Sequence, residues 1–184
     1  MSRHFVSINI IIVLLLASTT TWGAGERHKH ASIAITSSEI SNDEAGAVSI
    51  ASPFYHDTVQ ARFSVAQAYK GGVKSGVYAW YDYKVYNLGI AAVLREVPDL
   101  LRVYAEGGLT HIDTDSSLSM KQATMGRYAL VGVELYLNPD SWLNCCSAYI
   151  ELGSTGKGAK AEQLDTQPVI GHGFVSTAGL RYYF

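Results

Sequence analysis

The nine residues Ala129-Leu130-Val131-Gly132-Val133-Glu134-Leu135-Tyr136-Leu137 alternate between two kinds of side chain. The odd-numbered positions are all aliphatic, whereas the even-numbered positions include the carboxylate of Glu134 and the phenol of Tyr136. Successive side chains of a β-strand point to opposite faces, so a strand between an apolar and a polar environment alternates in this way. The stretch therefore predicts a β-strand with one wholly apolar face.

The same alternation recurs on both sides of this strand and predicts seven more. In chain order, these segments are His30–Ser37, Ala45–Phe54, Thr58–Tyr69, Gly76–Glu96, Leu101–Thr110, Trp142–Leu152 and Ile170–Phe184. The long polar connections are predicted at Ser38–Glu44, Lys70–Gly76, Ile112–Thr124 and Gly153–Pro168, and the short ones at Tyr55–Asp57, Val97–Asp99 and Asn138–Ser141. Long and short connections alternate along the chain. This layout predicts an all-β protein, an eight-stranded antiparallel up-and-down transmembrane β-barrel with long external loops and short periplasmic turns.

The segment Gly76–Glu96 is too long for one crossing of a membrane by a β-strand, which takes about 9–11 residues. We expect a strand that runs past the bilayer, with a β-bulge that shifts its register. Its aromatic residues are expected near the outer membrane interface. They are Tyr78, Trp80, Tyr81, Tyr83 and Tyr86.

The composition of the 184-residue chain agrees with a β-rich protein of one domain. Charged residues make up 16% of it and the net charge is −2, so no basic excess points to nucleic-acid binding. Two cysteines do not make a disulfide scaffold. Cys145 and Cys146 are adjacent in a predicted strand, so we expect two buried thiols on opposite faces, or a link to another chain.

Alternation alone also fits a soluble periplasmic β-sandwich, in which the apolar face is buried. The charges of the polar face favour the barrel, because they are arginine and glutamate with little lysine, which suits paired side chains in an enclosed lumen. We predict that this lumen charge network fills the barrel. Its expected members are Arg62, Arg95, Arg102, Glu106, Glu134, Glu151 and Arg181.

The first segment, residues 1–24, has the layout of a secretory signal peptide, with Arg3 before an apolar run and small residues after it. The apolar run is short for a membrane-spanning helix. We therefore expect export, and a barrel domain formed by residues 25–184. Strand-end aromatics are predicted at Phe54, Trp142, Tyr182 and Phe184.

The last eight residues, Thr177-Ala178-Gly179-Leu180-Arg181-Tyr182-Tyr183-Phe184, resemble the C-terminal signal of Gram-negative outer-membrane proteins. Thr177, Gly179, Tyr182 and Phe184 occupy the polar, glycine and two aromatic positions of that signal. With the signal peptide and the alternating strands, the chain resembles the small OmpA-type and OmpX-type barrels. The resemblance implies a bacterial outer-membrane location, contact with lipid and lipopolysaccharide, and recognition by the barrel-assembly machinery.

Residues suited to catalysis are few. His111 and His172 are predicted on the outward face near the loop end, and Ser176 lies about 13 Å along the strand from His172, too far for a direct pair. We assign no catalytic residue, metal ligand or cofactor. The favoured function is a structural or surface-interaction role carried by the external loops, whose ligand the sequence does not identify. The alternatives are a lipid A-modifying enzyme of the outer leaflet and a narrow pore.

Overall fold

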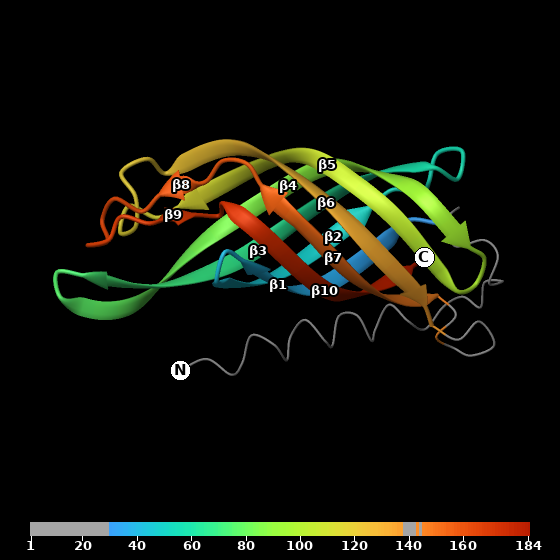
Figure 1. Cartoon of the computed structure of the whole chain (residues 1–184), viewed down its shortest axis with the longest axis horizontal. Helices are drawn as coiled ribbons and strands as arrows, with labels where there is room; N and C mark the ends of the chain where they lie inside the picture. The colour runs from blue at the N-terminus through green and yellow to red at the C-terminus, as the bar shows by residue number, and fades with distance from the viewer. Residues whose placement is uncertain (1–29, 138–142, 144) are drawn as a thin grey trace.

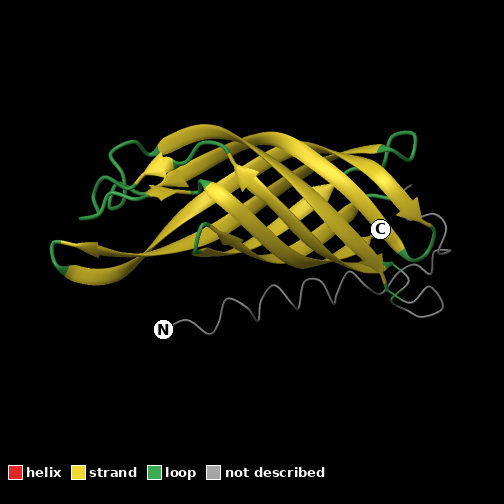
Figure 2. Ribbon diagram, viewed as in Figure 1, coloured by secondary structure: helices red, strands yellow, loops and turns green. Residues whose placement is uncertain are grey.

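A computed structural model describes residues 30–137, 143 and 145–184 of the chain, and their backbone forms a closed β-barrel (Figures 1 and 2). Eight strands close the barrel, and each is antiparallel to both of its neighbours. The predicted fold class is therefore confirmed. Among the described residues, no helix is long and apolar enough to cross a membrane. The predicted signal peptide, Trp142 and the turn Asn138–Ser141 lie outside the described residues.

The barrel strands are long, and they close through a seam between the first and the last. They are β1 (Ser32–Ile40), β2 (Asp43–Ala51), β3 (Val59–Lys74), β4 (Val77–Val97), β5 (Leu101–Thr114), β6 (Ala123–Tyr136), β7 (Cys146–Thr155) and β10 (Gly173–Tyr183). β1 pairs with β10 from Ser32–Tyr183 to Ile40–Val175. Closure removes the open sheet edges that would otherwise leave backbone groups unpaired.

The two ends of the barrel differ. At the terminal end, where β1 begins and β10 ends, the connections follow β2, β4 and β6. At the opposite end, here called the hairpin end, the connections are residues 41–42, 75–76, 115–122 and 156–172. The last of these contains a two-stranded sheet, β8 (Ala159–Lys160) paired with β9 (Val169–Ile170).

Two of the predicted long connections are wrong, because they are two-residue turns. Ser41 and Asn42 join β1 to β2 with φ angles of 49° and 71°, and Ser75 and Gly76 join β3 to β4 with φ angles of 52° and 80°. Positive φ at both central residues is the conformation of the type I′ hairpin turn, whose twist matches that of the flanking strands. The polar stretches Ser38–Glu44 and Lys70–Gly76 therefore extend the strands instead of forming loops.

The exterior of the barrel carries a belt of exposed apolar side chains, while the interior is polar. Exposed members of this belt are Val48, Ile50, Phe63, Leu88, Ile90, Leu94, Leu109, Val131, Val133, Leu135, Ile150, Leu152 and Leu180. Ile90 and Ile150 are 61% and 62% exposed, whereas Arg102 and Glu134 inside the barrel are 0% exposed. This polarity is the reverse of that of a soluble β-sandwich, so the soluble alternative is wrong.

A β-bulge in β4 changes the predicted direction of two charged side chains. The register between β4 and β5 shifts between Val93 and Arg95, so Arg95 pairs with the outward Val103 and Glu96 pairs with the inward Arg102. Arg95 is exposed on the outer face and is not part of the lumen network, contrary to the prediction. Glu96 takes its place inside. The sequence predicted a bulge in this segment but not its position.

Candidate functional site

The candidate site is the lumen of the barrel, which holds the buried charged side chains. A first layer of these side chains lies near the terminal end. Glu134 on β6 accepts a charge-assisted hydrogen bond from Arg181 on β10 at 2.9 Å, and its carboxylate lies 3.7 Å from Arg102 on β5. Tyr183 and Ser147 also donate hydrogen bonds to Glu134. One carboxylate is therefore held between two guanidinium groups, both fully buried.

Glu96 completes this layer at its rim. Its carboxylate accepts hydrogen bonds from Arg102 at 3.1 Å and from Tyr136 at 2.7 Å. The Arg102 guanidinium also lies 4.3 Å from the centroid of the Phe54 ring. Phe54 therefore lies at the terminal end as predicted, but its ring is buried in the lumen against a cation instead of facing lipid.

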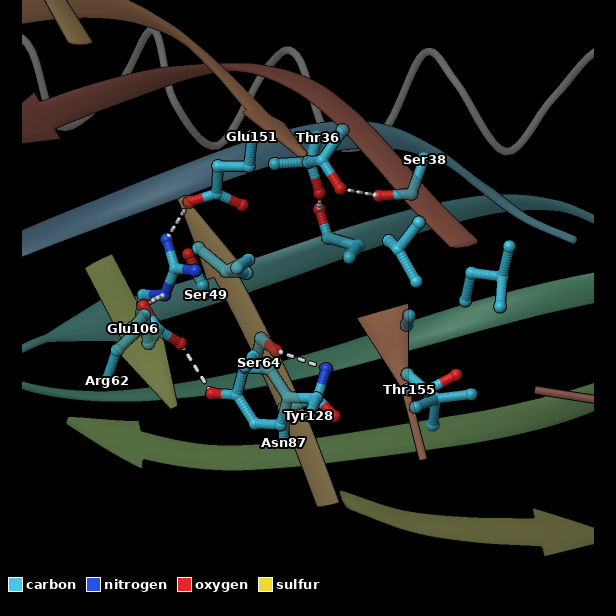
Figure 3. A pocket seen from close by; sticks show the side chains of 18 of the residues that line it. Thr36, Ser38, Ser49, Arg62, Ser64, Asn87, Glu106, Tyr128, Glu151 and Thr155 are labelled. Atoms are coloured by element: carbon cyan, nitrogen blue, oxygen red, sulfur yellow. Dashed lines mark hydrogen bonds and ion pairs between the residues drawn. The ribbon is translucent and has the colours of Figure 1, made fainter. Parts of the chain in front are cut away.

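A second charged layer lies one step further into the barrel, where Arg62 on β3 bridges two carboxylates. Its Nε is 2.7 Å from Glu106 Oε2, and its Nη1 donates to Glu151 (Figure 3). Tyr128 donates to Glu106, and Tyr104 donates to Glu151. As in the first layer, each carboxylate contacts at least one guanidinium group and at least one hydroxyl group, and here the two carboxylates share Arg62. This pairing offsets the loss of hydration, which would otherwise cost several kcal/mol for each buried ion.

The lumen tyrosines lie over inward-facing glycines on neighbouring strands. A Cβ atom placed on Gly132 would come within 2.4 Å of the Tyr104 ring, and one on Gly179 within 2.8 Å of Tyr149. Both glycines pair directly across the ladder with the tyrosine that covers them. Gly179 therefore has a packing role inside the barrel. This role is separate from its predicted place in an assembly signal.

Beyond the second layer is a cavity of about 70 Å³ lined by both hydroxyl-bearing and aliphatic residues (Figure 3). Ser38 and Thr177 are hydrogen-bonded at 3.0 Å, and Asn87 donates to Ser64 at 3.3 Å. Asn87 Oδ1 is buried and has no hydrogen-bond partner among the described residues. A site for one water takes roughly 10–15 Å³, so the cavity has room for several water molecules.

Apolar residues close the lumen at the hairpin end. Leu118 comes from the connection 115–122, and Ala161, Leu164 and Ile170 come from the connection 156–172. They pack with residues of the barrel wall, and each is at most 2% exposed. We call these four residues the mouth plug. Beneath them, Asp43 is held by Lys70 at 2.6 Å and by the Tyr83 hydroxyl at 2.7 Å.

The connection 115–122 has its own local order at the surface. The backbone N–H of Ser117 and the hydroxyl of Ser116 both donate to the Asp115 carboxylate, which lowers its pKa below the usual range. Lys74 of β3 donates to the Ser117 carbonyl at 3.0 Å. These contacts hold the loop that inserts Leu118 into the mouth plug.

Six of the seven predicted network residues meet in the lumen, in two separate groups. Arg102, Glu134 and Arg181 form one group, and Arg62, Glu106 and Glu151 form the other. The prediction missed Glu96, because the bulge inverts the alternation there, and it missed the tyrosines as members. The sequence does contain a pattern that identifies these tyrosines as members, because they all occupy the polar face of their strands. They are Tyr104, Tyr128, Tyr136, Tyr149 and Tyr183.

The predicted aromatic cluster of Gly76–Glu96 divides between three environments. Tyr83 points inward and is buried, and Tyr81 packs beside it against the same core. Tyr86 faces outward next to His111 at the edge of the apolar belt, with ring centroids 5.9 Å apart. Tyr78 and Trp80 also face outward but lie farther along the strand. Only Tyr86 is therefore placed as the interface prediction requires.

The remaining reactive residues do not come together as one catalytic group in the described part of the chain. His111 faces outward, and its Nδ1 lies 3.1 Å from the Met125 sulfur, while His172 is exposed in the connection before β10. Ser176 pairs with Glu39 across the ladder, not with a histidine. Cys145 is buried and Cys146 is half-buried. In the described part of the chain, no three His, Cys, Asp or Glu side chains gather as a metal site.

Comparison with solved structures finds this fold in bacterial outer-membrane proteins. The N-terminal β-barrel domain of OprF from Pseudomonas aeruginosa matches with a TM-score of 0.60 and 14% identity, over 85% of this chain and 98% of that domain. Ail, the attachment invasion locus protein of Yersinia pestis, solved in complex with the heparin analogue sucrose octasulfate, matches with a TM-score of 0.40 and 16% identity, over 84% of this chain and 96% of Ail. No family model and no curated protein sequence matches the chain. The chain thus has the fold of an eight-stranded outer-membrane barrel.

The first charged layer predicts a strong dependence of stability on Glu134. Replacing Glu134 with Gln leaves Arg102 and Arg181 buried without a full counter-charge, so we expect the free energy of unfolding to fall by about 3–5 kcal/mol. Glu96→Gln is the matched control, because the Glu96 side chain is 28% exposed and water screens its charge. We expect that variant to lose about 1 kcal/mol or less. Urea unfolding in lipid vesicles measures both, and equal losses would contradict the account of the lumen.

Proposed function

We propose that the chain is a closed outer-membrane barrel whose function lies on the surface that it presents at the hairpin end. The observation that carries this proposal is the filled lumen. Two layers of paired charges occupy the terminal half, and the mouth plug of Leu118, Ala161, Leu164 and Ile170 occupies the other end. A barrel filled in this way acts as a scaffold, so recognition falls to the connections and strand ends outside the membrane.

The exterior supports the membrane location. The exposed apolar belt surrounds a polar interior, which is the arrangement of a barrel in lipid. At the hairpin-end border of this belt, the outward face carries Lys84 and Arg127, both exposed. Cationic side chains at this level are suited to the phosphate groups of lipopolysaccharide. We infer that outer-membrane lipid and lipopolysaccharide surround the belt.

Export and assembly complete the proposal. Residues 1–24 would act as the signal peptide, and the barrel-assembly machinery would recognise Thr177, Gly179, Tyr182 and Phe184. Tyr182 and Phe184 stack at the end of the chain with ring centroids 6.5 Å apart, and Phe184 is 54% exposed whereas Tyr182 is buried. Thr177 and Gly179 point into the lumen. The exposed ring of Phe184 supports recognition of the last aromatic residue by another protein.

The proposed orientation predicts which end of the barrel is accessible on intact cells. In a background with Cys145→Ser and Cys146→Ser, we introduce Met120→Cys at the hairpin end and Leu100→Cys at the terminal end. Both residues are exposed, at 74% and 56%. A membrane-impermeant maleimide is expected to label Met120→Cys on intact cells, and Leu100→Cys only after the outer membrane is permeabilised.

The cysteine-free background serves as the control for this labelling. Labelling of Leu100→Cys alone on intact cells would reverse the orientation, and equal labelling of both positions without permeabilisation would remove the membrane location. Either result would refute the proposed surface role of the hairpin end.

The filled lumen predicts the absence of ion conductance. The refolded chain in a planar lipid bilayer should produce no discrete conductance steps, because both charged layers and the mouth plug would have to rearrange before an ion could pass. The Arg62→Gln variant provides the comparison. Steady openings of the unaltered protein that disappear in this variant would establish a narrow pore instead.

A further inference from the structure

The second charged layer contains more carboxylates than cations. Among the described residues, Arg62 is its only cation, and it pairs with both Glu106 and Glu151. The first layer, by contrast, contains two arginines and two glutamates, so its charges balance. A buried charge without a partner is costly, because the protein interior replaces none of its lost hydration. The second layer therefore requires one further positive charge.

Glu151 is the carboxylate that leaves an oxygen atom available for this charge. Its Oε1 accepts hydrogen bonds from both Arg62 and Tyr104. No hydrogen bond or ion pair reaches its Oε2 within the described part of the chain, although Glu151 is only 4% exposed. In Glu106, both oxygens are engaged, by Tyr128 and by Arg62. The free oxygen of Glu151 points away from Arg62, and Glu151 lines the cavity (Figure 3).

Neutral oxygen atoms line the same cavity. Thr177 of β10 pairs across the ladder with Glu151 and with Ser38, and the hydroxyl groups of Thr177 and Ser38 are hydrogen-bonded at 3.0 Å. Asn87 of β4 donates to Ser64 of β3, while its buried Oδ1 has no hydrogen-bond partner among the described residues. Carboxylate, hydroxyl and amide oxygens are the ligands that hard cations prefer. The cavity thus combines an excess negative charge with cation ligands from several strands.

We propose that the cavity binds one small monovalent cation, Na⁺ or K⁺, together with water. Glu151 Oε2 is the charged ligand, and the hydroxyl oxygens of Ser38 and Thr177 and the Oδ1 of Asn87 are the neutral ligands. A single positive charge balances the second layer, whereas a divalent ion leaves an excess positive charge buried. The cavity volume of about 70 Å³ has room for an ion with several water molecules.

The cation site is compatible with a closed lumen. The mouth plug closes the lumen at the hairpin end, and the two charged layers lie on the terminal side of the cavity. A cation held between them becomes bound as the barrel folds and exchanges slowly with the solution. It is therefore a fixed part of the lumen and not a conducted ion.

The test measures how the stability of the refolded barrel depends on the cation. The chain is refolded into lipid vesicles in choline chloride, with NaCl or KCl replacing choline at constant ionic strength. Heat-dependent gel mobility confirms folding, and urea unfolding gives the midpoint. A ligand of the folded state stabilises it by mass action. We therefore expect each tenfold rise in Na⁺ or K⁺ above its dissociation constant to raise the midpoint by about 0.5–1 M urea.

Glu151→Gln is the decisive variant, because it keeps the shape of the side chain and removes the excess charge. We expect its midpoint to be the same in choline, Na⁺ and K⁺. Glu96→Gln is the matched control, since it makes the same substitution outside the cavity and should keep the dependence. Ser38→Ala removes one neutral ligand and should raise the required cation concentration by about 10-fold. If Glu151→Gln does not refold, Glu106→Gln removes the same charge from the layer and should weaken the dependence by at least as much.

Two results would overturn this proposal while leaving the proposed outer-membrane role intact. The midpoint of the unaltered barrel could be the same in all three salts, and an infrared band of a protonated carboxyl group that is lost in Glu151→Gln would then assign the balancing charge to a proton. The cation dependence could also persist unchanged in Glu151→Gln, which would place the ion outside the cavity. Labelling of Met120→Cys on intact cells is independent of both results.

Discussion

The pairing of buried arginine and glutamate side chains inside a closed barrel is the constraint on which the rest of this structure depends. With the apolar side chains placed outside, the charged side chains have no bulk water and must meet each other. Glu134 lies between Arg102 and Arg181, and Arg62 lies between Glu106 and Glu151. Arg102 and Glu134 are on the neighbouring strands β5 and β6, but the other three contacts join strands that are not neighbours in the barrel wall, so they fix the lumen across its width.

The same need to pair buried charges explains why the bulge in β4 matters for the lumen. Without the shift between Val93 and Arg95, the lumen would hold a fourth arginine and lack Glu96. The bulge turns Arg95 to the outside and places Glu96 against Arg102 and Tyr136. A local backbone irregularity therefore sets the charge balance of the interior, and the filled interior in turn leaves the hairpin end as the part of the protein available to other molecules.

Alternation predicted the barrel and six of its seven proposed network residues, because side-chain direction in a regular strand follows directly from position. It failed where the backbone is irregular or where contacts are distant in sequence. Ser41-Asn42 and Ser75-Gly76 form tight turns in polar stretches that resemble loops. The mouth plug was not predictable, since Leu118 and Leu164 are isolated apolar residues in polar connections whose partners depend on closure of the barrel.

The central claim is that the apolar face meets lipid while the charged face is enclosed, and gel mobility with and without boiling tests it most directly. The samples are the outer-membrane and periplasmic fractions of a bacterium that expresses the chain. The account predicts a band in the outer-membrane fraction that shifts on boiling, because a closed barrel with a paired interior stays folded until it is heated. A periplasmic band with no shift would contradict the account.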